Sequence, residues 1–80
     1  MFINKTPEGR NNRCGKNVAE YRKALGISQR ELADRLQIAG LDVDKNAVQR
    51  MEAGKRFVTD IELAALAGVL RQSLEALLKE

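Results

Sequence analysis

The chain has 80 residues, 44% of them hydrophobic, and a net charge of +3 from 14 Lys and Arg against 11 Asp and Glu. This length fits one small domain and is too short for two. The single cysteine cannot form a disulfide within the chain, and the lack of histidine argues against a zinc site and most nucleophile–base pairs. With one proline and three aromatic residues, the composition favours helices over strands.

Charge is distributed unevenly along the sequence. Residues 1–56 carry 12 basic and 7 acidic side chains, a net +5, whereas residues 57–80 carry 2 and 4, a net −2. The excess of basic residues in positions 1–56 favours a polyanionic partner, although an ordinary solvated surface could carry the same charges. No apolar run approaches the roughly 18 residues that span a bilayer, and no early segment resembles a secretion signal. We therefore expect a cytoplasmic protein without a membrane segment, metal or cofactor.

The first 13 residues differ in character from the rest. They contain Pro7, Gly9 and three asparagines, show little periodicity and have a net charge of +2. This composition predicts a flexible basic N-terminal arm over residues 1–13, followed by one folded domain over residues 14–80.

A first helix is predicted from residue 14 onward, because apolar residues recur three and four positions apart. The residues of this face are Cys14, Val18, Tyr21 and Leu25. Gly26 is suited to end the helix, since glycine readily adopts the left-handed conformation that closes helices. On this face Cys14 is expected to be a small buried hydrophobe rather than a reactive thiol.

A second helix is predicted to begin at Ser28, whose hydroxyl can accept from the amide of Glu31 while the Glu31 carboxylate reaches back to the amide of Ser28. Gly40 is a plausible terminator. Ile38 lies opposite the apolar side, so either it packs elsewhere or the helix ends before it. The apolar side consists of Leu32, Ala33 and Leu36.

The third predicted helix runs from its N-cap, Asp44, to Ala53, and Gly54 closes it. Its apolar side consists of Ala47, Val48 and Met51, and its polar side of Lys45, Asn46, Gln49 and Arg50. Arg and Lys suit guanine and Asn and Gln suit adenine, so the polar side could contact base edges. Ordinary solvated helices are polar on one side too.

Two more helices follow, and no strand is needed. Thr59 and Glu62 form a second capping box, and Ser73 caps a final short helix. The fourth helix has a core stripe of Leu63, Leu66, Ala67 and Leu70, and an apolar reverse side of Ile61, Ala65, Gly68 and Val69. A helix that is apolar on both sides should be central or meet a partner chain. In the fifth helix the buried candidates are Leu74, Leu77 and Leu78.

Residues 14–78 resemble the phage repressor and Cro-type (Xre-like) helix-turn-helix family. The matching positions are Gly15, Val18 and Arg22, residues 25–33, residues 48–56, and the Leu66, Ala67 and Leu70 pattern. The resemblance implies an all-α fold, a compact five-helix bundle of the lambda-repressor-like DNA-binding type. In this sequence the turn between the second and third helices is lengthened by about five residues, 37–41, against three or four common in the motif.

The resemblance also implies a function. It indicates a sequence-specific DNA-binding transcriptional regulator, acting as a homodimer on a two-fold site, with the third helix in the major groove of double-stranded DNA. Lys45, Asn46 and Arg50 stand where the family reads bases, and Gln49 lies on the same face. The expected phosphate-binding residues are Gln29, Arg30, Lys55 and Arg56.

Further positions also matter in this resemblance. Arg22 and Glu52 occupy positions where the family commonly has a structural ion pair, although both could instead be solvated surface charges. Asp44 places a carboxylate where the chain should approach phosphate, which favours a capping role at the third helix. Arg71 and Gln72 stand where the family commonly has a glycine and an apolar residue between the fourth and fifth helices, a region it often uses for dimerisation.

Two other classes of function are alternatives to DNA binding. A protein-interaction module, such as the antitoxin-like partner of another protein, is the main alternative, because the fourth helix is apolar on its reverse side. An enzyme is disfavoured, since carboxylates such as Glu31 and Asp34 occur without a nucleophile or metal ligands. The sequence therefore predicts a DNA-binding protein rather than an enzyme.

Overall fold

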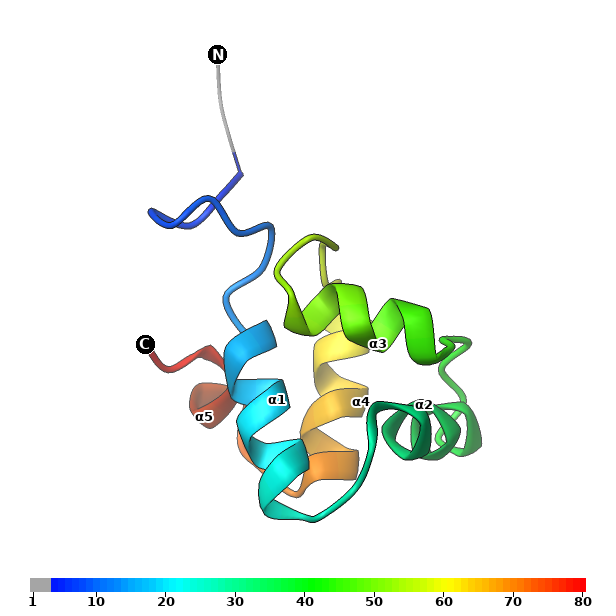
Figure 1. The fold of residues 1–80 in the computed structure, drawn as a ribbon. Helices are drawn as coiled ribbons and strands as arrows, with labels where there is room; N and C mark the ends of the chain where they lie inside the picture. The colour runs from blue at the N-terminus through cyan, green and yellow to red at the C-terminus, as the bar shows by residue number, and fades with distance from the viewer. Residues whose placement is uncertain (1–3) are drawn as a thin grey trace.

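The computed structural model describes residues 4–80 and contains five α-helices (Figure 1). They are α1 (Gly15–Ala24), α2 (Gln29–Ile38), α3 (Lys45–Glu52), α4 (Asp60–Leu70) and α5 (Leu74–Leu78). No strand occurs in this part of the chain, so the prediction of an all-α, five-helix fold is confirmed. The predicted arm includes residues 1–3, which lie outside the described residues.

Side-chain caps fix where four of the helices begin. Ser28, Asp44, Thr59 and Ser73 each accept a hydrogen bond from the backbone N–H three residues on. The capping box at Thr59 is complete. At Ser28 the prediction of a full box is wrong in one half, because the Glu31 carboxylate bonds Arg35, one turn further on, at 2.7 Å. These local bonds satisfy amides that have no partner within the helix.

The core lies between the inner faces of all five helices. α4 contacts α1, α2 and α5, and α3 contacts α1 and α2. Figure 1 shows α5 and α2 on opposite sides of α1, with α3 at one end of the bundle. The largest fully buried side chains are Leu32, Leu36, Met51, Leu66, Leu70, Leu77, Val18, Val48 and Cys14. Burial raises the pKa of the Cys14 thiol, as expected for a structural cysteine.

Some predicted core residues are instead exposed. Leu25, Leu74 and Leu78 are 44%, 49% and 40% exposed, because each lies at the end of a helix where the packed face runs out. Ile38 is also exposed, at 87%, and α2 continues through it. Thus neither predicted alternative for Ile38 holds within the described residues.

The reverse side of α4 is divided. Ile61 is 73% exposed and Gly68 is exposed, whereas Ala65 and Val69 are partly buried against the core. The helix is therefore central on one side and open to solvent on the other. It ends at Arg71, which adopts the left-handed conformation with φ of 57°, where a glycine would be unstrained.

The lengthened turn between α2 and α3 covers residues 39–44. The prediction placed the extra residues at 37–41, but Gln37 and Ile38 complete the last turn of α2. Gly40, with φ of 98°, turns the chain so that the amide of Leu41 bonds the carbonyl of Leu36 at 2.9 Å. The Gln37 amide then donates to the carbonyl of Val43 at 2.7 Å. The turn is longer than usual but internally bonded.

Candidate nucleic-acid interface

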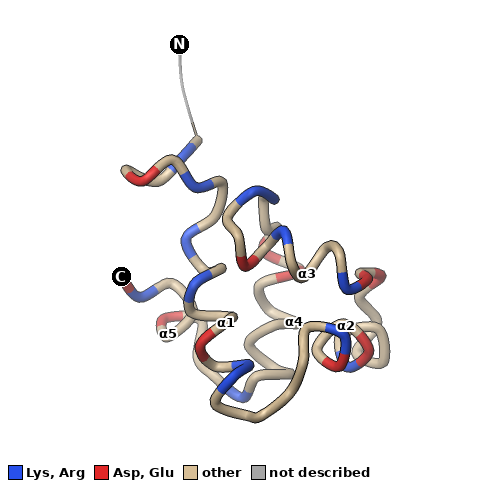
Figure 2. The backbone as a smooth tube through the Cα atoms, in the orientation of Figure 1, with Lys and Arg blue, Asp and Glu red and all other residues tan. Residues whose placement is uncertain are grey.

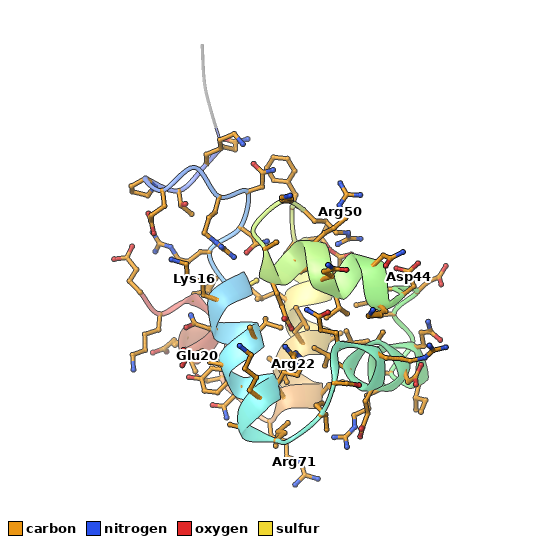
Figure 3. The ribbon with its side chains drawn as sticks, viewed as in Figure 1. Lys16, Glu20, Arg22, Asp44, Arg50 and Arg71 are labelled. Carbon is orange, nitrogen blue, oxygen red and sulfur yellow. The ribbon has the colours of Figure 1, made fainter. Side chains whose placement is uncertain are left out.

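The two faces of α3 have opposite characters. Its inner side chains, Val48 and Met51, are fully buried. The four predicted base-reading side chains, Lys45, Asn46, Gln49 and Arg50, are all exposed on the outer side. Figure 3 shows Asp44 at one end of this helix and Arg50 projecting from its outer side. The Asp44 carboxylate accepts from the amide of Ala47 at 2.8 Å, which is the capping role expected for it.

Arg22 of α1 and Glu52 of α3 form a bidentate ion pair. The Nε–Oε2 and Nη2–Oε1 distances are 2.7 and 3.0 Å, and the two side chains are 11% and 7% exposed. The guanidinium also donates to the carbonyl of Ile27 at 2.9 Å. Figure 3 shows Arg22 between α1 and α3. The pair is buried rather than solvated, and it connects the α1–α2 turn to the end of α3.

The predicted phosphate-binding residues of α2 lie in its first turn. Gln29 is half-buried, and its amide donates to Oε1 of Glu52 at 2.9 Å, so Glu52 orients it. A side-chain amide has two N–H donors, which leaves one for an external acceptor. Arg30 is exposed. The N-terminus of α2 thus combines a fixed amide with an exposed guanidinium.

The two cations after α3 differ from each other. Lys55 is exposed. Arg56 instead pairs with the buried Glu62, with Nη1–Oε1 and Nη2–Oε2 both at 2.9 Å. Hydrogen bonding from Arg56 lowers the pKa of the Glu62 carboxyl, and the same bond raises the pKa of Arg56. Arg56 therefore has an internal structural role that the sequence did not suggest, alongside the phosphate contact predicted for it.

Residues 10–12 are bonded to the end of α3 and to the loop after it. Asn12 is 8% exposed, and its amide donates to the carbonyls of Met51 and Arg56 at 3.0 and 2.7 Å. Its side-chain oxygen accepts from the amide of Gly15 at 2.8 Å. Arg10 donates to the carbonyl of Glu52 at 2.7 Å. The prediction of a flexible arm is therefore wrong for residues 10–12, which the long-range bonds hold in place.

Asn11 and two glycines complete this contact. The amide N–H of Asn11 donates to the carbonyl of Gly54 at 2.7 Å, and its side chain donates to that of Lys55 at 3.0 Å. A Cβ at Gly15 or Gly54 would come within 2.7 Å of the Arg10 side chain, so Arg10 lies directly against both. One feature of the sequence could have indicated the role of Asn12. Asparagine is a preferred capping residue, and Asn12 stands three positions before the amide of Gly15.

Basic residues gather around the end of α3 where the arm meets the loop. In Figure 2 the Lys and Arg segments of the arm, the α3–α4 loop and the adjoining end of α3 lie on the same side of the molecule. Glu52, at the end of α3, and Glu62, at the start of α4, are paired with Arg22 and Arg56, whereas Glu8 of the arm is exposed. At the opposite end of α3 the sequence is acidic, with Asp42 and Asp44. A polyanion would therefore meet its most favourable charge near the C-terminal end of α3.

Two further observations concern other kinds of site. None of the helices in residues 4–80 has the length and apolar character needed to cross a membrane. Within the same residues, no group of three or more His, Cys, Asp and Glu side chains is placed to hold a metal ion.

A helix with donors along its exposed face, buried on its inner face and joined by a turn to a preceding helix, is the arrangement of helix-turn-helix DNA-binding proteins. The family model HTH_3, helix-turn-helix, matches residues 18–77, and the chain belongs to this family. The Cro/repressor-type assignment made from the sequence is thereby confirmed.

A solved structure supports the same conclusion. The chain is similar to the restriction-modification controller protein C.AhdI from Aeromonas hydrophila, with 30% identity over 79% of this chain and 84% of that one, and a TM-score of 0.69. No curated protein is significantly similar to the chain. The protein is a DNA-binding transcriptional regulator, of a family that acts by binding DNA rather than by catalysis.

Proposed function

We propose that α3 enters the major groove of a two-fold symmetric DNA site and that the protein binds this site as a homodimer. The observation that carries the proposal is the exposed face of α3, where Lys45, Asn46, Gln49 and Arg50 lie opposite the fully buried side chains of the inner face, Val48 and Met51. These side chains can donate to guanine and form paired hydrogen bonds with adenine. Arg50, the longest donor among them, is the residue we expect to carry most of the preference.

Phosphate contacts flank this helix on both sides. At the start of α2, Gln29 and Arg30 would donate to one phosphate, together with the free amides of the helix. After α3, Lys55 would contact a second. Arg56 is 31% exposed and has N–H groups beyond those that bind Glu62, so it can add a contact without breaking its ion pair. These contacts supply affinity and register but carry no sequence information.

The outer side of α4 is the proposed dimer surface. Helical spacing puts exposed Ile61, Ala64 and Gly68 on one side, with small residues that allow a second helix to approach closely. Exposed Asp60 and Arg71 mark its two ends. If two copies of α4 pack antiparallel about a two-fold axis, Asp60 of each copy lies beside Arg71 of the other. This self-complementarity favours a second copy of the chain over an unrelated partner.

Selection of bound sequences from a random duplex pool tests the DNA-binding mode. We expect an enriched palindrome, and a log-log salt slope near −4 to −5 for about five neutralised phosphates. On the selected site, Arg50→Ala should cost about 1 to 3 kcal/mol and relax the preference. Arg30→Ala, an exposed change, should weaken all duplexes equally. If Arg50→Ala and Arg30→Ala lose affinity in the same sequence-independent way, the assignment of base-reading residues is wrong.

Sedimentation without DNA tests the dimer. Ile61→Glu should shift the protein to monomers, whereas Ile38→Glu, a change of the same kind at an exposed isoleucine on α2, should not. Arg71→Asp should weaken association, and the added change Asp60→Arg should restore it. A parent chain that stays monomeric at all concentrations would contradict the homodimer and favour the alternative, docking of a different protein on α4.

The similarity to a restriction-modification controller protein suggests the setting of this regulation. We propose that the chain controls genes of a restriction-modification system. The selected palindrome should then occur upstream of a neighbouring pair of endonuclease and methyltransferase genes, and a footprint at that position checks it. A palindrome found only at unrelated promoters would contradict this setting while leaving the DNA-binding mode intact.

A further inference from the structure

Lys5 is held close to the loop that follows α3 by a short chain of hydrogen bonds. Its ammonium donates to the side-chain oxygen of Asn11 at 2.7 Å. Asn11 in turn donates from its side chain to the carbonyl of Lys55 and from its backbone to the carbonyl of Gly54. A residue 50 positions away in the sequence therefore lies beside Lys55 in space.

The same loop connects Lys5 to the recognition helix. The amide of Lys55 donates to the carbonyl of Arg50 at 2.9 Å, so the exposed side chains of Lys5, Lys55 and Arg50 belong to one end of α3. Figure 1 shows the arm passing beside this loop. We call these three residues the end cluster. An ammonium has three N–H donors, and Lys5 uses one of them on Asn11.

Internal neutralisation does not account for the end cluster. Glu52 and Glu62, at the end of α3 and the start of α4, already have guanidinium partners, and within the described residues no ion pair joins exposed Glu8 of the arm to Lys5, Lys55 or Arg50. Cations near the last turn of a helix do favour its dipole, but that effect is small and screened for exposed groups. Lys5 and Lys55 are exposed cations brought together through Asn11, and a phosphate backbone is a favourable counterpart for them, because each added cation releases a condensed counterion.

We propose that Lys5 contacts the phosphate backbone of bound DNA next to the phosphate held by Lys55, and that Asn11 is the positioning residue for it. The arm then forms part of the DNA-binding surface and extends it beyond the C-terminal end of α3. This inference rests on the proposed docking of α3, because the end cluster reaches phosphates only if the outer face of α3 faces the groove.

Lys5→Gln in the full chain tests the contact, measured as binding to the selected duplex over a range of salt concentrations. We expect the salt slope to fall in magnitude by about 0.9 and the affinity for all duplexes to fall by roughly the same factor, about threefold to tenfold at low salt. The matched control is Lys79→Gln, which removes the same charge beyond α5, a helix packed on α1 and α4. It should leave the slope unchanged.

Asn11→Ala tests the positioning role, because it leaves every charge in place. It should lose part of the affinity that Lys5→Gln loses, and Lys5→Gln should then cause little further loss in that background. A thermal melt of each variant, and Asn11→Asp, which keeps the acceptor for Lys5, separate positioning from folding. Additive losses of the two changes would overturn the role of Asn11.

The outcomes distinguish the proposed contact of Lys5 from the proposed docking of α3, on which it rests. If Lys5→Gln and Lys79→Gln give the same slope while Arg50→Ala still relaxes the preference, the contact of Lys5 is overturned and the docking of α3 stands. If Arg50→Ala does not change the sequence preference, the proposed docking of α3 is contradicted, and the proposed contact of Lys5, which depends on it, is contradicted with it. A slope reduced only by Lys5→Gln supports both.

Discussion

The two ends of α3 are held in different ways. At its C-terminal end, carbonyls and a carboxylate bond Arg10, Asn12 and Arg22, which lie 30 to 42 positions away in the sequence. At its N-terminal end the bonds are local, since Asp44 caps the helix and Gln37 bonds Val43, six positions on. The difference indicates that long-range contacts at one end aim the helix, while the other end is set by its own turn.

The largest effect should follow from breaking the ion pair at the C-terminal end. Glu52→Ala leaves the Arg22 guanidinium buried without its partner and removes the acceptor that orients Gln29. We expect a loss of about 3 to 5 kcal/mol in the free energy of unfolding, measured by denaturant melts.

The double variant Arg22→Met with Glu52→Leu is the control for this prediction. An apolar pair avoids desolvating two charges, so much of the lost stability should return. Single-variant losses below about half a kcal/mol would show that the C-terminal end does not depend on this pair, and the contrast between the two ends would disappear.

Asn12→Ala should have the next largest effect. It leaves the carbonyls of Met51 and Arg56 and the amide of Gly15 without this partner, which we expect to cost about 2 to 3 kcal/mol. Asn17→Ala is the matched control, because Asn17 also donates to two carbonyls but lies partly exposed on the side of α5. If both variants lose the same free energy of unfolding, the bonds of Asn12 to the end of α3 stabilise the protein no more than the bonds of Asn17 near α5 do.

The same contrast explains what could be predicted from the sequence. Helix starts at Ser28, Asp44, Thr59 and Ser73 were found because a capping residue acts within three positions. The buried stripes follow from helical spacing for the same reason. The Arg22–Glu52 pair was expected only through a family resemblance, since nothing local in the sequence connects these two residues.

Contacts between distant polar residues escaped prediction. Asn11 and Asn12 were interpreted as residues of a flexible arm, because their partners are carbonyls about 40 positions on, which no sequence pattern marks. Arg56 was expected to bind phosphate, and its partner Glu62 to serve a capping box, yet the geometry also joins them. Backbone acceptors carry no residue identity, so contacts to them become visible only in the folded chain.

A moderate, pH-dependent effect on stability is expected from the ion pair of Arg56 and Glu62, which joins the loop after α3 to α4. Since the folded chain has a lowered pKa at Glu62, the pair stabilises the protein above the ordinary glutamate pKa of about 4.3. That stabilisation, about 1 kcal/mol, should be lost as the pH falls from there through the lowered value. Glu62→Gln should flatten this part of the stability profile. An unchanged profile would contradict the role of the pair.

The smallest effect on stability should come from the N-terminal end. Asp44→Asn keeps the cap, so the free energy of unfolding should change by less than about 0.5 kcal/mol, whereas Asp44→Ala should cost about 1 kcal/mol. Removing the carboxylate should strengthen DNA binding about twofold to fivefold, because it no longer faces phosphate. An affinity that does not change would place Asp44 away from the bound duplex.

The single buried thiol is a natural probe of local unfolding at the start of α1. Cys14 is 2% exposed, adjoins the segment bonded to α3, and is the only cysteine in the chain. A thiol reagent can modify it only when the start of α1 separates from the core, so the labelling rate measures the population of that open form. Labelling should quicken in Asn12→Ala and slow when DNA is bound. Local breathing at the arm could thus be followed without an introduced probe.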